Sequence, residues 1–268
     1  MRIAALIISV LALLVGAALA FGLWRTGVLT RGLRARMAAA EAATLPAAQA
    51  LPPQIRDWAI RSGALTGHRR VLLHQEAQME LQPDAGWKAI TAEQEISLTS
   101  LGFLWRARQG GIGPLPLVAV TDSYTHGEGV LSVRLLGAFP VVTARGAQID
   151  LAEAMRYLAE LPWAPDAVLS NGDLRWQVLQ AGRWQVSAPN GAAVTFTVRD
   201  GDLVKMQAAA RPATDPSGQP ATYDWEGRFS DFETVAGRRI PLAGEVGYIR
   251  EGRYVPYFRG RITKYRVE

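Results

Sequence analysis

Four polar residues at alternate positions form the cluster of this sequence best suited to chemistry. Asp122, Tyr124, His126 and Glu128 would project from one face of a continuous extended strand. Two carboxylates beside an imidazole can exchange protons with a substrate, which is general acid–base catalysis. A solvated strand end running into a glycine turn fits the same pattern. Two hypotheses therefore stay open: an enzyme that uses Asp122, His126 and Glu128, or a polar face without a reaction.

Established catalytic and metal-binding motifs are absent from the sequence. It contains no G-x-S-x-G, no H-E-x-x-H and no G-x-x-x-x-G-K-[ST], and it has no cysteine. His68 and His74 stand six residues apart, which separates them by about 20 Å on a straight strand at ~3.3 Å per residue. We therefore expect no catalytic set, no metal site and no cofactor.

Tryptophan is the most informative residue type. Eight are present, and each can bury ~200 Å² while offering one N–H donor. They could fill the core of a large sheet, or line a hollow that holds an apolar or amphiphilic ligand. For the second use, the candidate ligand-binding residues are Trp87, Trp105, Asp122, Tyr124, Glu128, Arg156, Trp163 and Trp176.

The elements that must position these residues are mostly strands. From residue 68 onward, short stretches of alternating apolar and polar residues are separated by turn signals such as Asp200–Gly201. No strand–helix–strand alternation appears, which disfavours a parallel sheet. We expect a mainly β (α+β) domain over residues 51–268. It would be a large curved antiparallel sheet or half-barrel of about a dozen strands, with a barrel-like sandwich as the alternative.

One or two helices are expected to pack on this sheet. The first covers residues 53–62, where a proline suits the first helical position. In the second, Asp150 is the predicted N-cap, and Glu153 three residues later completes a pattern resembling a capping box. Arg156 and Glu160 follow on the same helix at a spacing that allows an ion pair.

The first residues form an apolar segment. Residues 3–23 carry no charge and only one polar side chain, and they would span about 30 Å as a helix. Trp24 and Arg25 end the run as interfacial anchors do. We expect residues 1–25 to be an uncleaved, single-pass transmembrane helix. A signal peptide cleaved after Ala18–Leu19–Ala20 is the alternative.

The positive charge is concentrated near this segment. The chain has 29 basic and 24 acidic residues, and five of the basic ones precede Glu41. The remainder is neutral, with 24 of each, so the sequence predicts no nucleic-acid partner. Residues 26–50 are predicted to be a basic juxtamembrane helix or a linker. The arginines after the span favour a cytoplasmic domain and a signal peptide favours the opposite side, so sidedness stays open.

The chain resembles an uncharacterised bacterial family with a Trp-rich signature, over about residues 45–265. The matching motifs are W-K-A-I-T-A-E-Q (87–94), G-F-L-W-R-A (102–107), D-S-Y-T-H-G-E-G (122–129), R-Y-L-A-E-L-P-W-A-P (156–165), Trp176, Arg211, Trp225 and G-R-R-I-P (237–241). The resemblance implies no known reaction. It implies a shape similar to the open half-barrels of the lipoprotein carriers of the LolA/LolB class, which hold acyl chains on a concave sheet.

These observations favour a non-enzymatic binding module in the cell membrane. The N-terminal helix would contact the bilayer, and an aromatic-lined concave sheet would hold a lipid-like or other apolar ligand. The alternatives are the acid–base enzyme described above and an envelope scaffold that binds another, unidentified protein.

Overall fold

Two antiparallel meanders join into one sheet of 13 strands. The computed structural model describes residues 2–43, 51–80, 86–113 and 115–268. The strands are β1 (Arg70–Met79), β2 (Lys88–Ser97), β3 (Phe103–Gln109), β4 (Val118–Thr125), β5 (Glu128–Leu135), β6 (Phe139–Ala144), β7 (Arg175–Gln180), β8 (Arg183–Ser187), β9 (Ala193–Arg199), β10 (Asp202–Thr214), β11 (Pro220–Val235), β12 (Arg238–Arg250) and β13 (Arg253–Val267). Their order is β6-β5-β4-β3-β2-β1-β13-β12-β11-β10-β9-β8-β7, so β1 and β13 form the seam. The predicted large curved antiparallel sheet is confirmed.

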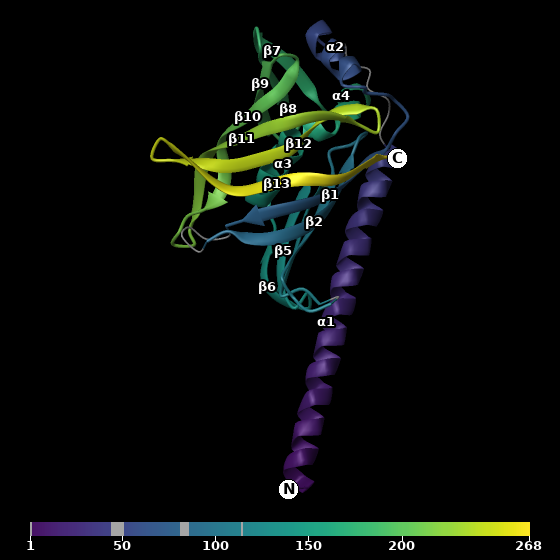
Figure 1. Cartoon of the computed structure of the whole chain (residues 1–268), viewed down its shortest axis with the longest axis vertical. Coiled ribbons are helices and arrows are strands. Elements are labelled where there is room, and N and C mark those ends of the chain that lie inside the picture. Colours follow the sequence, from purple (N-terminus) through teal and green to yellow (C-terminus); the bar gives the residue numbers. More distant parts are fainter. Residues whose placement is uncertain (1, 44–50, 81–85, 114) are drawn as a thin grey trace.

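Helices occupy the crossover between the two meanders. They are α3 (Ala147–Ala159), the 3₁₀ helix η1 (Leu161–Trp163) and α4 (Pro165–Ser170). Figure 1 shows α3 behind the strands of the curved sheet, and it packs against β4, β5, β9 and β10. Fully buried Tyr157 holds this crossover in place, because its hydroxyl donates to the Ser97 carbonyl at 2.9 Å. The sheet therefore wraps around a helix, and its concave face is the inside of the molecule.

The start of α3 differs from the prediction. The N-cap is Gly146 at φ 103°, and no side chain caps the helix. The carboxylate of Asp150 instead accepts a hydrogen bond from the backbone N–H of Gly129 at 2.7 Å. The cap prediction is wrong because Asp150 connects the helix to β5. Glu153 is consequently free to face the interior.

The helix α2 (Pro53–Arg61) forms where the sequence predicts it. Its proline stands at the first helical turn, and Ile55, Trp58 and Ala59 are buried. Proline is tolerated there because the N–H it lacks has no intrahelical partner. The short α4 was not anticipated, although it too begins with a proline.

The N-terminal helix α1 (Arg2–Ala43) extends well beyond the predicted boundary at residue 25. The segment Leu6–Ala43 is long and apolar enough to cross a membrane, and its most apolar part projects away from the sheet (Figure 1). The later turns pack on the outer face of the sheet, where Leu33 contacts Leu104 and Val130. Part of the predicted juxtamembrane segment is thus a docked helix, while residues 44–50 lie outside the described residues.

Ion pairs hold α1 against the sheet. Arg34 donates to Glu95 of β2, with Nε 2.8 Å from Oε1. Arg70 of β1 binds both Glu41 and Glu95, at 2.8 and 3.4 Å. Glu95 of β2 thus binds Arg34 of α1, and Glu41 of α1 binds Arg70 of β1. Met37 of the same helix is buried and lies close to Gly102.

Candidate ligand cavity

A cavity of about 650 Å³ lies between α3 and the concave face of the sheet. Both meanders contribute to its wall, with β1, β3, β4 and β5 on one side and β10 to β13 on the other. Its apolar lining includes Met79, Val120, Leu131, Val133, Ile149, Met206, Phe229, Val246 and Phe258. The volume falls within the roughly 300–1,000 Å³ typical of small-molecule sites. The half-barrel is therefore hollow, although much of its remaining interior is packed.

Arg156 of α3 is the first of two cations inside the cavity. Its guanidinium donates to Asp122 of β4 and, from Nε, to Glu160 at 2.9 Å. It also lies over the rings of Phe103 and Trp105, at 4.9 and 4.8 Å from their centroids. Two carboxylates and two aromatic faces thus compensate this buried charge. The ion pair between Arg156 and Glu160 is the one that their spacing of four residues allows on a helix.

A chain of hydrogen bonds continues from this pair beneath the cavity. Gln94 of β2 donates to Glu160, and Gln75 of β1 donates to Gln94 at 3.3 Å. The indole of Trp105 in turn donates to Gln75 at 2.9 Å. All of these side chains are buried. The chain fixes the positions of α3 and three neighbouring strands relative to one another.

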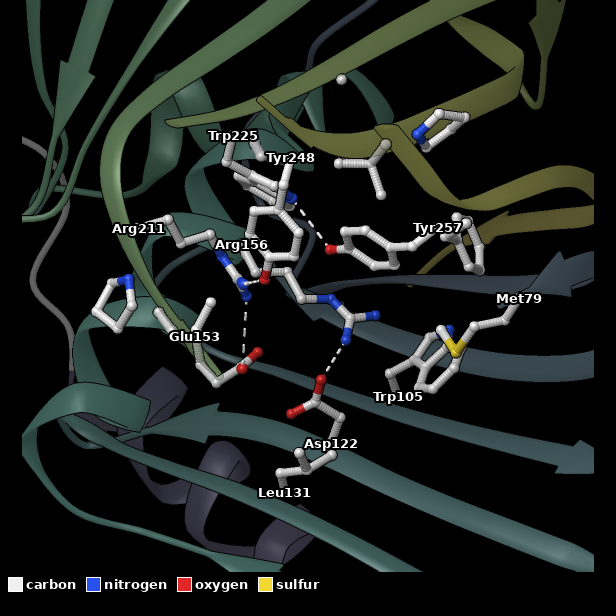
Figure 2. Close-up of a pocket in the computed structure, with 18 of the residues that line it drawn as sticks. Met79, Trp105, Asp122, Leu131, Glu153, Arg156, Arg211, Trp225, Tyr248 and Tyr257 are labelled. Carbon is white, nitrogen blue, oxygen red and sulfur yellow. Dashed lines mark hydrogen bonds and ion pairs between the residues drawn. The ribbon is translucent and has the colours of Figure 1, made fainter. Parts of the chain in front are cut away.

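Arg211 of β10 is the second cation, and its surroundings are different. Its Nη1 donates to the hydroxyl of Tyr248 at 2.7 Å, and its guanidinium lies 4.5 Å from the ring centroid of Trp225. The nearest carboxylate is Glu153 of α3, with Nη2 and Oε1 3.8 Å apart. Figure 2 shows Arg211, Glu153 and Tyr248 converging from three elements.

Glu153 and Asp122 form a coupled pair of carboxyl groups. Burial and the neighbouring Asp122 carboxylate raise the pKa of Glu153 to about 8. Burial also raises the pKa of Asp122, but Arg156 and Arg211 oppose that shift. Glu153 therefore holds the proton of the pair at neutral pH.

Aromatic residues of the second meander complete the wall. The indole of Trp225 donates to the hydroxyl of Tyr257 at 3.0 Å, and Tyr257 stacks on Tyr248 with centroids 5.1 Å apart. Burial raises the pKa of Tyr257. On the other side, the indole of Trp163 donates to the Pro241 carbonyl at 2.8 Å. The polar edges of Trp225 and Trp163 are thus satisfied within the protein.

Four of the eight candidate residues line the cavity: Trp105, Asp122, Arg156 and Trp163. Trp176 is buried elsewhere, stacked on Phe196 with centroids 6.2 Å apart. Tyr124 is buried as well, and its hydroxyl accepts a hydrogen bond from Asn190. Trp87 is half-buried below the guanidinium of Arg259. Tryptophan therefore serves both predicted uses, as core and as lining.

The predicted common face of Asp122, Tyr124, His126 and Glu128 is wrong. His126, at φ 51°, and the next glycine form a two-residue turn, so Glu128 pairs with Thr125 across the hairpin. Glu128 then points outward, where it binds Arg36 at 2.9 Å, and His126 contacts the Arg36 carbonyl. Only Asp122 reaches the cavity. The proposed acid–base set therefore has no common substrate position.

Among the residues that the structure describes, no group of three His, Cys, Asp or Glu side chains could hold a metal ion. Sequence reasoning missed Glu153, Arg211, Tyr248 and Tyr257 as cavity residues. The available signal was a charged residue, Arg211, directly after three alanines in a strand that continues into Pro212. An arginine in such a surrounding is typical of an irregular, inward-turned position.

Comparison with known proteins places the chain among uncharacterised relatives. A family model described as "Family of unknown function (DUF6544)" matches residues 41–260, which confirms the resemblance predicted from the Trp-rich motifs. A search of curated proteins finds no match.

Solved structures with a similar shape include a LolA superfamily protein from Nitrosomonas europaea. It is 10% identical with a TM-score of 0.46, and the match covers 81% of this chain and 94% of that one. A DUF1329 family protein from Desulfovibrio piger is 10% identical with a TM-score of 0.44, covering 79% and 91%. LprF from Mycobacterium bovis is 11% identical with a TM-score of 0.26, covering 79% and 90%.

Proposed function

The chain belongs to the family of unknown function DUF6544, and we propose that it is a membrane-anchored binding module that holds one apolar chain inside its half-barrel. The observation that carries this proposal is the cavity of about 650 Å³ beside α3. A hollow of this size leaves apolar side chains facing water inside the fold, and covering them with an alkyl chain is favourable. The lining of valine, leucine, methionine and phenylalanine matches an alkyl chain.

The membrane anchor is the apolar part of α1. Between Leu6 and Trp24 most of its residues are exposed to the surroundings of the molecule, which suits lipid contact. From Thr26 onward the same helix is bonded to the sheet, because the Thr26 hydroxyl donates to the Gly137 carbonyl at 2.7 Å. The span and the domain are thus one continuous element, which favours an uncleaved anchor. Alkaline extraction of membranes and the intact mass of the mature chain test this part.

Binding is tested with a fluorophore-tagged 16-carbon chain and the full-length protein in nanodiscs. Leu131→Trp fills the cavity from β5 and is expected to weaken probe binding at least tenfold. Leu179→Trp is the matched control, because Leu179 of β7 is exposed and does not line the cavity. Absence of saturable binding by the wild-type chain, or equal binding by both variants, would contradict the proposal.

A further inference from the structure

A bulge in β10 turns Arg211 into the cavity. The register with β11 shifts between Ala208 and Arg211, so that one extra residue is inserted. Ala210 adopts φ 48°, and its N–H donates to Asp224 at 3.1 Å. Non-glycine residues adopt this conformation at a cost, and such positions concentrate at binding sites. The bulge puts Arg211 beside Trp225 on the inner face instead of on the outer face.

Arg211 has unused hydrogen-bonding capacity although it is more than nine-tenths buried. Its Nε has no partner, and Glu153 lies beyond hydrogen-bond distance of Nη2, so Tyr248 is its only close acceptor in the described structure. Arg156, by contrast, binds two carboxylates. Buried guanidinium groups without acceptors are costly, because their N–H groups have lost water. An additional acceptor would remove this cost.

The charge of the surroundings selects the type of acceptor. At neutral pH Glu153 is largely protonated, so no ionised carboxylate touches Arg211. The Oε2 atom of Glu153 is also buried without a partner, and its proton can be donated to an incoming group. An oxyanion accepts both kinds of donor and can bind a guanidinium through two parallel hydrogen bonds. A hydroxyl or ammonium group would leave the cation unneutralised.

We propose that Arg211 is the head-group site of the cavity and binds a carboxylate or phosphate whose alkyl chain fills the apolar part. This assignment rests on the proposed function, since it needs a chain in the cavity. It names the ligand class as a single-chain anionic amphiphile. Arg211 contacts the ligand directly, whereas Asp224 and Ala210 only hold Arg211 in position.

The test uses displacement of the tagged 16-carbon probe from the full-length chain in nanodiscs. Palmitate and 1-palmitoyl lysophosphatidate are the carboxylate and phosphate arms, and hexadecanol is the uncharged reference. Wild-type protein should prefer at least one of the two anions over hexadecanol by about tenfold or more. Arg211→Gln should abolish that preference and still bind the probe. Arg228→Gln should keep it, because Arg228 is exposed and stacks on Tyr254.

The outcomes separate the two proposals. If Arg211→Gln keeps the anion preference, or wild-type protein shows none, the head-group assignment is wrong while the binding module stands. If no chain binds to the wild type at all, both are wrong. The arm with the stronger displacement identifies the head group as a fatty acid or a phospholipid. Acetate and inorganic phosphate, added alone, should not displace the probe.

A second observation concerns the free edge of the sheet. The strand β6 has an exposed row of apolar side chains, and neighbouring loops extend it. The exposed residues of this edge patch are Ile112, Leu117, Leu135, Phe139, Val141 and Val142. Exposed apolar edges usually mark an interaction surface, since they would otherwise pair with other chains.

The edge patch adjoins the place where α1 leaves the sheet. A Cβ added to Gly22 would lie 2.6 Å from Cβ of Ala138, so the β5–β6 turn touches the helix directly. This contact is one turn from Trp24 and Arg25, which mark the membrane boundary of the helix. In Figure 1 the β5–β6 end of the sheet lies beside α1, and the helix continues beyond it. We infer that the edge patch rests in the head-group layer of the bilayer that α1 crosses.

The absence of cysteine allows a direct test. Val141→Cys and, as a control at the far edge of the sheet, Gln180→Cys are labelled with an environment-sensitive fluorophore in the full chain. In vesicles of phosphatidylcholine and phosphatidylglycerol carrying a head-group quencher, the label at residue 141 should be quenched at least twofold more than the label at 180. If both labels are quenched equally while the protein still resists alkaline extraction, the edge patch does not rest in the head-group layer. The proposed anchor would stand.

Discussion

Glu153 links the stability of this protein to pH. Its ordinary pKa is 4.5, and burial raises it to about 8 in the folded chain. Between these values the unfolded chain is ionised while the folded chain keeps its proton. The stabilising contribution of neutral Glu153 is therefore complete below about pH 4.5 and is lost as pH rises towards 8.

Glu153→Gln should consequently stabilise the protein at high pH. The amide imitates the protonated carboxyl, because it is uncharged and keeps a hydrogen-bond donor. We expect a gain on the order of 1 kcal/mol at pH 8–9, or about 2–4 °C in Tm, that shrinks towards pH 4. Thermal unfolding followed by circular dichroism measures it. Glu128→Gln is the control, because its carboxylate has a lowered pKa beside Arg36. An equal gain at pH 4 and pH 9 would refute the role of ionisation.

The same residue should make head-group binding depend on pH. Glu153 faces Asp122 of β4, Arg156 of its own helix and Arg211 of β10, and Tyr248 of β12 contacts the same Arg211. Above pH 8 the ionised Glu153 competes with a ligand anion for Arg211. We expect the affinity for palmitate to fall at least threefold between pH 7 and pH 9, and to stay level in Glu153→Gln. A parallel fall in both proteins would point to another titrating group.

At the scale of single elements, the bulge in β10 decides which residues reach the cavity. Because side chains alternate along a strand, one inserted residue moves every following side chain to the opposite face. Strict alternation from Met206 and Ala208 would leave Arg211 on the outside. Sequence periodicity could locate β10, but it could not show that the residues after the bulge change face. The bulge depends on the contact between Ala210 and Asp224.

Glycine at position 210 should therefore stabilise the protein. Glycine adopts positive φ at little cost, whereas alanine is strained there. We expect Ala210→Gly to gain about 0.5–1 kcal/mol, measured by urea unfolding. Ala209→Gly, one residue earlier and at ordinary backbone angles, should lose a similar amount. If both variants lose stability, the backbone at 210 is not strained.

Other elements show where sequence reasoning succeeds and fails. Alternation and turn residues located the strands, because most strands pair with their neighbours in the sequence, the seam of β1 with β13 being the exception. The cap at Asp150 failed, since a distant amide, that of Gly129, takes the carboxylate. The face shared by Asp122 and Glu128 failed because a two-residue turn reverses the chain between them. In the first case the deciding contact comes from a distant element, and in the second the alternation of side chains was carried across a turn at His126 and Gly127.

At the scale of the whole molecule, the cavity exists because two meanders meet around one helix. The pairing of β1 with β13 runs from Val71↔Val267 to Met79↔Phe258 and joins the first meander to the second. Arg156 is held by the first meander, through Asp122, and Arg211 belongs to the second. The polar groups of the cavity therefore converge only when both halves and α3 are assembled. A bound ligand should stabilise the seam as well as the pocket.

The anchor and the cavity should nevertheless be separable. The side-chain hydrogen bonds and ion pairs that join α1 to the sheet begin at Thr26. They include the ion pairs of Arg34 with Glu95 and of Glu41 with Arg70. A chain that starts at residue 26 keeps all of them and loses the exposed apolar turns that we propose as the anchor. We expect it to leave the membrane, to fold with the same circular dichroism spectrum, and to bind the tagged 16-carbon probe within about twofold of the full chain. Arg34→Gln with Glu41→Gln in that truncated chain should detach the rest of α1 and lower Tm. If truncation alone abolishes binding, the membrane-spanning part takes part in the site, and the cavity is not a self-contained binding unit.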